Sequence, residues 1–282
     1  MMIQIILTNI VYALVAAMLA MAGVSAHAQQ AYSTPELAAD ALNSALATND
    51  VDGLRAVLGV NYRSLIPVGD VMQDDIYRFL EAWSRYHATE VEGDRRARVV
   101  VGDSGWIFPA PIVKRQDGWH FDLIAGQHEV SLRQLGHNEL STVETLLALA
   151  DAQQRYADSV GKGQYARRLI SSPGKTDGLY WPTRTEADAS PVGPDALAMT
   201  SDTPTDEAFS GYHFRVIPTT KEKNHEYTFV AWPAKYGITG IHTFLMSSDR
   251  VIYQRDLGPS TSTRLKNVQT LTTGDWRPMV AH

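Results

Sequence analysis

The 282-residue chain contains no cysteine, which excludes disulfide bonds and thiolate metal sites and leaves the fold to depend on packing alone. It also lacks the G-x-G-x-x-G and P-loop patterns that bind nucleotides. Cationic residues are in the minority, since 25 Lys and Arg stand against 31 Asp and Glu for a net charge of −6. This composition provides no basic footprint, and we expect no nucleic-acid partner and no cofactor.

The nine histidines form no metal-binding pair of the H-x-x-x-H or H-E-x-x-H type. His120 and His128 are eight residues apart, and His213 and His225 are twelve apart. We therefore predict no metal site, and we expect these histidines to be partly exposed residues of strands.

Long apolar runs are absent after the N-terminus. Residues 3–24 carry no charge, and Ala26 and Ala28 then supply the small −3 and −1 positions of a signal-peptidase site before Gln29. No Lys or Arg precedes the run, which departs from the usual signal peptide. We expect residues 1–28 to be a cleaved signal peptide and the mature protein to be periplasmic or secreted. The alternatives are an uncleaved membrane anchor, which would be the only contact with a membrane, and a buried core helix.

Residues 29–135 are predicted to form an α+β domain in which helices precede an antiparallel meander. Thr34 and Pro35 supply a cap and a first helical position, and apolar residues then recur at helical spacing up to Leu46. Further helices are predicted at 51–58 and 74–87, and short strands at 98–101, 106–113 and 118–123. Pro109 and Pro111 favour an edge position or a bulge for the middle strand.

Residues 136–282 are predicted to form a second α+β domain, in which one long helix lies on an antiparallel meander. The helix begins at Asn138 and continues to near Gly161 with an apolar stripe along one face. An irregular excursion rich in Pro, Gly, Ser and Thr covers residues 169–206. Strands are then predicted at 212–218, 227–232, 239–246 and 251–256, with Pro233 and Gly237 interrupting the sheet between the second and third.

Three stretches of the second domain carry a resemblance to a known family. The helix end at residues 152–156 (AQQRY), together with the strand pair at 240–244 and 249–253, resembles the globular half of type IV pilins and pseudopilins. In those proteins the hydrophobic assembly helix continues directly into the globular domain. Here a complete domain separates the apolar N-terminal segment from the helix, and a G-F-T-L-x-E junction is missing. We therefore expect binding of partners rather than assembly into a pilin-type filament.

A second resemblance covers the whole mature chain. Residues 169–181 (LISSPGKTDGLYW) and 230–237 (VAWPAKYG) are similar to an exported bacterial family known as domain of unknown function 2950. The resemblance implies export and a shared fold, and the family brings no established activity. The first domain more loosely resembles cystatin-like and nuclear-transport-factor-like α+β folds.

Ser172 and Lys175 spell the S-x-x-K pattern of penicillin-binding proteins and class A β-lactamases. That chemistry needs both residues on one helical turn, so that the lysine amine reaches the serine hydroxyl. Pro173 and Gly174 lie between them and predict a structural turn instead. No clear S-D-N or K-T-G partner motif accompanies the pair, and no catalytic residue is predicted.

The candidate binding site lies at the start of the irregular excursion and consists of Arg168, Lys175, Asp177, Tyr180 and Trp181. Large rings in a loop either line a ligand cleft or pack the loop onto its own core, and both alternatives stay open. The preferred function is a non-enzymatic envelope protein that interacts with another envelope protein or polymer. The alternative is a hydrolase of envelope polymer or peptide, which would use acids, or Ser172 and Lys175, in a cleft between the two domains.

Overall fold

The structure is a computed structural model that describes residues 29–66, 70–182, 189–218, 227–265 and 274–279. The predicted signal peptide, residues 1–28, lies outside the described residues. Contacts within the chain divide it into two compact units, with the division between Val130 and Ser131. This division and the predicted domain boundary after residue 135 fall within the same long helix.

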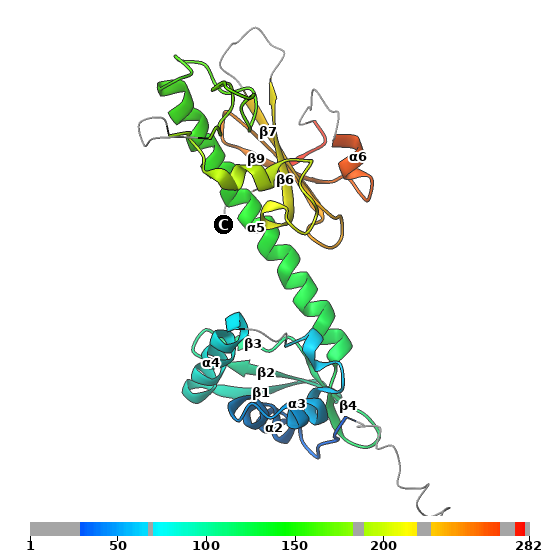
Figure 1. The fold of residues 1–282 in the computed structure, drawn as a ribbon. Coiled ribbons are helices and arrows are strands. Elements are labelled where there is room, and N and C mark those ends of the chain that lie inside the picture. The colour runs from blue at the N-terminus through cyan, green and yellow to red at the C-terminus, as the bar shows by residue number, and fades with distance from the viewer. Residues whose placement is uncertain (1–28, 67–69, 183–188, 219–226, 266–273, 280–282) are drawn as a thin grey trace, which may run out of the picture. The chain divides into compact units, whose positions relative to one another are not determined.

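Helices come first in the first unit (Figure 1). They are α2 Pro35–Ala47, α3 Val51–Leu58, the short 3-10 helix η1 Tyr62–Ser64, and α4 Asp70–Arg85. The first two begin at caps that the sequence supplies, because the side chains of Thr34 and Asp50 accept hydrogen bonds from backbone N–H groups of the first turn. The predicted helix at 74–87 is therefore present as α4, with an earlier start at Asp70.

The first sheet is antiparallel and has the order β1-β2-β4-β5, with β3 paired to β2. Its strands are β1 His87–Glu92, β2 Arg96–Val101, β3 Trp106–Ile107, β4 Ile112–Lys114 and β5 Trp119–Phe121. The edge strand β1 has no counterpart among the predicted strands, because its largely exposed residues lack an apolar alternation. The prediction of one strand over 106–113 is wrong, since Pro109 and Pro111 lie between β3 and β4.

The core of the first unit lies between its sheet and its helices. Alternate residues of β2, Ala97, Val99 and Val101, are buried together with Leu42 of α2 and Phe121 of β5. Side chains two positions apart on a strand share one face, so β2 buries this face against the helices. The first unit therefore has a hydrophobic core of its own.

The long helix α5 covers Leu123–Asp158. The predicted start at Asn138 is wrong, because the Asp122 side chain accepts a hydrogen bond from the N–H of Ala125 at 3.0 Å and caps the helix far earlier. Between Asp122 and Asn138 the sequence holds Gly126 and Gly136, which weaken the helical signal. The first turns of α5 belong to the first unit and the remainder to the second.

The second sheet is an antiparallel meander with the order β10-β9-β8-β7-β6, and the four predicted strands are all present in it. They are β6 Tyr212–Pro218, β7 Tyr227–Pro233, β8 His242–Ser247 and β9 Ile252–Asp256. The predicted third strand starts too early, since residues 239–241 form the loop before β8. The sequence analysis missed β10, Arg277–Pro278, because two residues carry no periodicity.

Short helices complete the second unit. They are η3 Pro194–Met199, η4 Phe209–Gly211 and α6 Thr261–Leu265. Over residues 169–206 the described chain is otherwise irregular, as predicted, and residues 183–188 lie outside the described part.

Strand β7 is buried on both faces. Phe229 and Ala231 belong to the core beneath α5, where Leu146 and Leu149 of that helix lie. The intervening Val230 and Trp232 belong to a second cluster that includes Leu265 of α6. The second unit is therefore a sheet covered on both faces, and the chain has the predicted α+β class with two antiparallel sheets. Within the described ranges, no helix combines the length and apolar character needed to cross a membrane.

Candidate functional site

Glu139 of α5 binds the loop that leads into β8. One of its carboxylate oxygens, Oε1, accepts hydrogen bonds from the backbone N–H groups of Ile241 at 2.9 Å and of His242 at 3.0 Å. The Nδ1 atom of His242 lies 3.1 Å from Oε2 of the same carboxylate. The helix therefore fixes both the backbone and the ring of His242.

Two neighbouring residues hold the same loop. The Asn138 side chain donates to the carbonyl of Thr239 at 2.9 Å, and the Tyr212 hydroxyl donates to the carbonyl of His242 at 2.9 Å. Tyr212 is fully buried; burial raises the pKa of its hydroxyl, and the nearby Glu139 carboxylate raises that pKa further. Gly240 is required here, because a Cβ at this position would overlap the Tyr212 hydroxyl.

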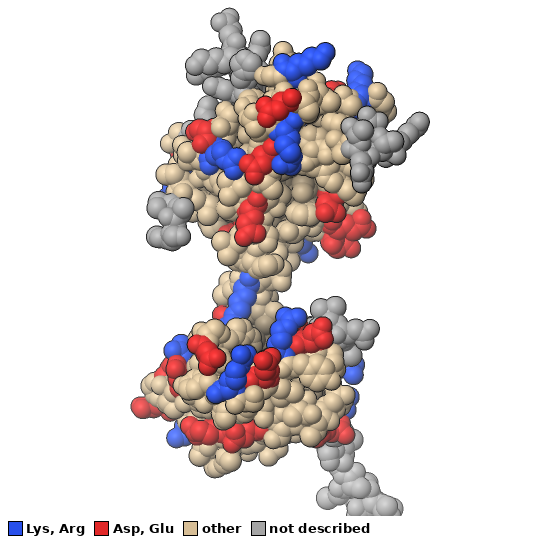
Figure 2. All heavy atoms as spheres, turned by 90° about the vertical axis from the view of Figure 1, so that its left-hand side faces the viewer, with Lys and Arg blue, Asp and Glu red and all other residues tan. Residues whose placement is uncertain are grey.

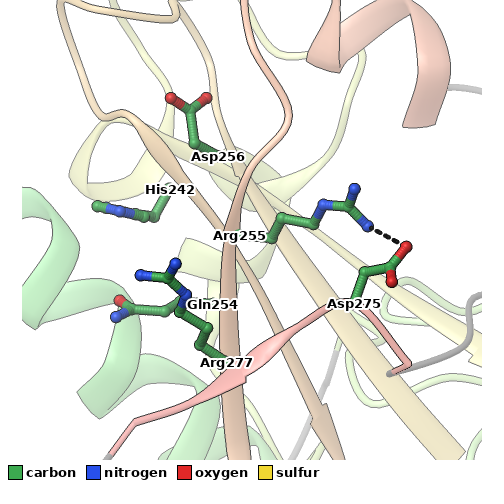
Figure 3. A pocket seen from close by; sticks show the side chains of 6 residues that line it. All are labelled: His242, Gln254, Arg255, Asp256, Asp275 and Arg277. Carbon is green, nitrogen blue, oxygen red and sulfur yellow. Dashed lines mark hydrogen bonds and ion pairs between the residues drawn. The ribbon is translucent and has the colours of Figure 1, made fainter.

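A polar hollow of about 360 Å³ lies beside this loop, where β9 meets the edge strand β10 of the second sheet (Figure 3). We call it the β9 hollow, and it is lined by His242, Gln254, Arg255, Asp256, Asp275 and Arg277. Asp256 lies opposite His242 in the strand register, and Arg277 lies opposite Gln254. Cross-strand partners and residues two apart share a face, so these four side chains lie on one face of the sheet.

Most charged groups of the β9 hollow already have partners. Asp256 accepts from the Tyr236 hydroxyl at 3.0 Å and from the N–H of Gly258 at 2.8 Å, and the first of these bonds raises the pKa of Tyr236. Arg255 points away from Arg277 and pairs with Asp275 at 3.3 Å (Figure 3). The acids of the hollow are thus neutralised or hydrogen-bonded within the protein.

Arg277 and Gln254 differ from these residues. Neither side chain makes a hydrogen bond or ion pair with any described residue, and Arg277 is exposed. In Figure 3 the guanidinium of Arg277 extends toward Gln254, on the side of β9 where His242 lies. The hollow therefore offers hydrogen-bond donors that the described residues leave unused.

The arrangement suits binding of a polar ligand. Convergent polar side chains in a concave site fix the orientation of a ligand. The six lining residues include no serine, threonine or lysine that could act as a nucleophile. Across the described chain, no group of three His, Asp or Glu side chains is arranged to hold a metal ion.

The structure brings two of the five predicted site residues together. Arg168 donates to the Ser172 hydroxyl at 2.6 Å, and that hydroxyl donates to Asp177 at 2.9 Å. Arg168 and Asp177 are also 4.0 Å apart as an ion pair. The backbone N–H of Ser172 is the main cause of a lowered pKa of Asp177, and its hydroxyl and the Arg168 charge lower it further.

Lys175 follows the predicted turn. Its backbone N–H donates to the carbonyl of Ser172 at 2.9 Å, and Gly174 has the positive φ of +70° that this turn needs after Pro173. The prediction of a structural turn at S-x-x-K is confirmed, and the Ser172 hydroxyl is bonded to Asp177 and Arg168. The Lys175 side chain is exposed.

The side chains of Tyr180 and Trp181 pack in or against the core and not at the surface of the turn. Trp181 is buried in the core beneath α5, and the partly buried Tyr180 packs against that core. These two rings follow the packing alternative, while Arg168, Lys175 and Asp177 lie at the surface of the turn. Binding at this turn stays a prediction.

The residues of the β9 hollow were not predicted from the sequence. Glu139 and His242 are 103 positions apart, and Arg277 belongs to a two-residue strand. No local spacing could have linked them. The one signal in the sequence was the run Gly240–Phe244, which carried the pilin resemblance and contains His242.

Surface charge gives no further site on the face drawn in Figure 2, where cationic and anionic side chains alternate over each unit. Fold and site together define a two-unit α+β protein with a polar hollow at one sheet edge. The chain belongs to the family described as Protein of unknown function (DUF2950), whose family model matches residues 29–279. It has no match among the curated proteins or among the solved structures.

Proposed function

We propose that this protein is exported and that it acts in the cell envelope, periplasmic or secreted, after cleavage between Ala28 and Gln29. Two observations support the cleavage position. The family match begins at Gln29. The Gln29 side chain is already part of the fold, since its amide donates to the carbonyls of Val57 at 2.9 Å and Phe121 at 2.7 Å.

Its role in the envelope is binding rather than catalysis, and its partner is an envelope protein or polymer. The β9 hollow is the observation that carries this proposal, because Gln254 and Arg277 converge there with donors that no described residue uses. The hydrogen bonds from Ile241 and His242 to Glu139 support the same role, since they fix the loop beside the hollow, and a fixed site is preorganised for its ligand.

The second unit supports a pilin-like relationship within this proposal. It places a long helix on an antiparallel meander, which is the arrangement that the pilin resemblance implies. The serine form of the envelope-hydrolase alternative finds no comparable support, because the Ser172 hydroxyl is bonded to Asp177 and Arg168.

The binding role is tested by mild cross-linking in intact cells that express the full chain, followed by purification and identification of bound partners. An Arg277→Ala variant is expected to lose partners that the unaltered protein retains. Arg78→Ala is the matched control, because Arg78 is an exposed arginine of the first unit, paired with Asp75 at 3.1 Å. A Lys175→Ala variant tests the predicted turn in the same experiment. An unchanged partner set in Arg277→Ala contradicts the β9 hollow, and a loss confined to Lys175→Ala moves the site to the turn.

Export is tested separately, by N-terminal sequencing of the protein from a periplasmic or culture-medium fraction. The expected first residue is Gln29. Protein that begins at Met1 in the membrane fraction would show that the apolar segment is retained as an anchor.

A further inference from the structure

The polar groups of the β9 hollow that already have partners, and those that have none among the described residues, indicate which chemical group a ligand would bring. Both lining acids have donors within the protein: Asp256 from Tyr236 and Gly258, and Asp275 from Arg255. An added cation would compete with those donors. The Arg277 guanidinium is the charged lining group that has no partner among the described residues.

From this arrangement we infer that the β9 hollow binds a carboxylate group of its ligand, held by Arg277 with support from Gln254. The inference rests on the proposed function and names the chemistry of its site. A guanidinium presents paired N–H donors in a planar fork, which matches the two oxygens of a carboxylate. The Gln254 amide adds a further donor beside it, since Gln254 and Arg277 are cross-strand partners.

His242 bounds the same hollow with a fixed ring. Its Nδ1 atom is held by Glu139, and Nε2 has no hydrogen-bond partner in the described structure. When Nδ1 of a neutral imidazole donates to a carboxylate, the opposite nitrogen is an acceptor. The donors for a ligand carboxylate are therefore those of Arg277 and Gln254.

Arg255 shows the same kind of pair, between a guanidinium and a carboxylate, within the protein itself. This arginine lies next to Gln254 on β9, and its guanidinium pairs with the Asp275 carboxylate at 3.3 Å. Arg277, on the neighbouring strand, has no such partner in the described chain. A ligand carboxylate would complete at Arg277 the kind of pair that the protein itself completes at Arg255.

The surrounding acids select a singly charged group over a doubly charged one. Asp256 lies two residues from Gln254 on the same face, and Glu139 lies behind His242. Each negative charge repels an anionic ligand, and this repulsion grows with the ligand's charge. A carboxylate is therefore favoured over a phosphate, whether it comes from the C-terminus of a peptide or from a sugar acid of a polymer.

The test uses the mature protein and isothermal titration calorimetry with paired probes. N-acetyl-Ala-Ala is compared with its C-terminal amide, glucuronate with glucose, and both acids with inorganic phosphate. We expect each acid to bind at least about tenfold more tightly than its neutral counterpart and more tightly than phosphate, because a charge-assisted pair is lost in the neutral probes. The acid that binds more tightly indicates whether the carboxylate of the natural ligand belongs to a peptide or to a sugar.

Variants place the binding in the hollow. Arg277→Gln is expected to weaken binding of the better acid at least about tenfold, and Arg277→Lys is expected to restore part of it, since lysine keeps the charge without the fork. Arg264→Gln, at an exposed arginine of α6, is the control and should bind as the unaltered protein does. Circular dichroism spectra must coincide for all variants.

The inference would be overturned by equal affinity for an acid and its neutral counterpart, by tighter binding of phosphate, or by unchanged affinity in Arg277→Gln. Absence of binding by both acids at millimolar concentration would also overturn it. The proposed function fails by a different result, namely a cross-linked partner set that Arg277→Ala leaves unchanged. If Arg277→Ala loses a partner but the acids bind no more tightly than their neutral counterparts, the proposed function stands and the carboxylate inference fails.

Discussion

Gly240 lies where the hydroxyl of Tyr212 leaves no room for a side chain. The hydroxyl is held in that position by its bond to the carbonyl of His242, and Glu139 holds the backbone on the other side of the loop. An added methyl group would force Tyr212 or the loop to move, and either movement breaks hydrogen bonds of buried groups. One residue thus determines whether the β9 hollow keeps its shape.

Gly240→Ala is therefore expected to lower the free energy of unfolding by about 1–3 kcal/mol, the range for overpacked sites. Urea unfolding followed by circular dichroism measures this change. Gly136→Ala is the control, because Gly136 lies exposed in α5 with nothing within 4 Å of an added Cβ. It should leave stability unchanged or raise it by up to about 1 kcal/mol. Equal effects of the two substitutions would contradict the steric argument.

At the scale of single residues the sequence predicted caps and turns well and long-range contacts poorly. The caps at Thr34 and the turn at Pro173 and Gly174 depend on neighbours within a few positions. The bond between Glu139 and His242 depends on a helix and a strand that the fold brings together across 103 positions. Such a pair has no local signature, so the site could not be predicted.

Among the elements, the turn at 172–177 is held by a single carboxylate. Asp177 accepts from the backbone and the hydroxyl of Ser172, and the resulting pKa lies below the ordinary value of 3.8. A carboxyl group whose pKa is lowered on folding stabilises the folded state above its unfolded pKa. The stabilisation disappears as the pH falls through the lower pKa of the folded protein.

Asp177→Asn is expected to lower Tm at neutral pH, because it removes the charge that those donors and Arg168 stabilise. The difference in Tm from the unaltered protein should shrink as the pH falls below about 4, where Asp177 itself becomes protonated. Thermal unfolding measured from pH 7 to pH 3 tests this. Asp40→Asn, an exposed residue of α2, should change Tm little at any pH. A difference for Asp177→Asn that does not vary with pH would contradict the role of the charge.

The elements themselves were predictable where their pattern is periodic. The four main strands of the second sheet follow apolar runs between turn residues, and the structure contains all four. The start of α5 was missed because Gly126 and Gly136 weaken the helical pattern, and because Asp122 was assigned to the end of a strand instead of a cap. Strands β1 and β10 were missed because an exposed edge and a two-residue strand have no apolar pattern.

At the scale of the whole molecule, each unit has its own hydrophobic core. Leu42 is fully buried in the first unit, and Leu245 is buried among the cluster on the α6 side of the second sheet. Units with separate cores can unfold separately. We therefore expect two transitions in differential scanning calorimetry of the mature protein.

Leu42→Ala should lower the first unit's transition, and Leu245→Ala the second unit's, each by the equivalent of about 2–5 kcal/mol for a buried leucine. The control is Leu37→Ala, since Leu37 lies on the same helix as Leu42 but is 49% exposed. A single transition that both core variants shift alike would show that the two units unfold together.

The anchored side chain of Gln29 has a chemical consequence for the cleavage proposed before this residue. A glutamine at a new N-terminus cyclises to pyroglutamate when its α-amine attacks its own side-chain amide carbon and releases ammonia. Here that amide donates to the carbonyls of both Val57 and Phe121, so that ring closure has to break two hydrogen bonds of the folded protein. Cleaved and folded protein should therefore keep an open glutamine, with an intact mass that matches the linear chain from Gln29 to His282. Gln29 would then remain accessible to aminopeptidases and to Edman chemistry, and a mass lower by one ammonia would show that cyclisation precedes folding.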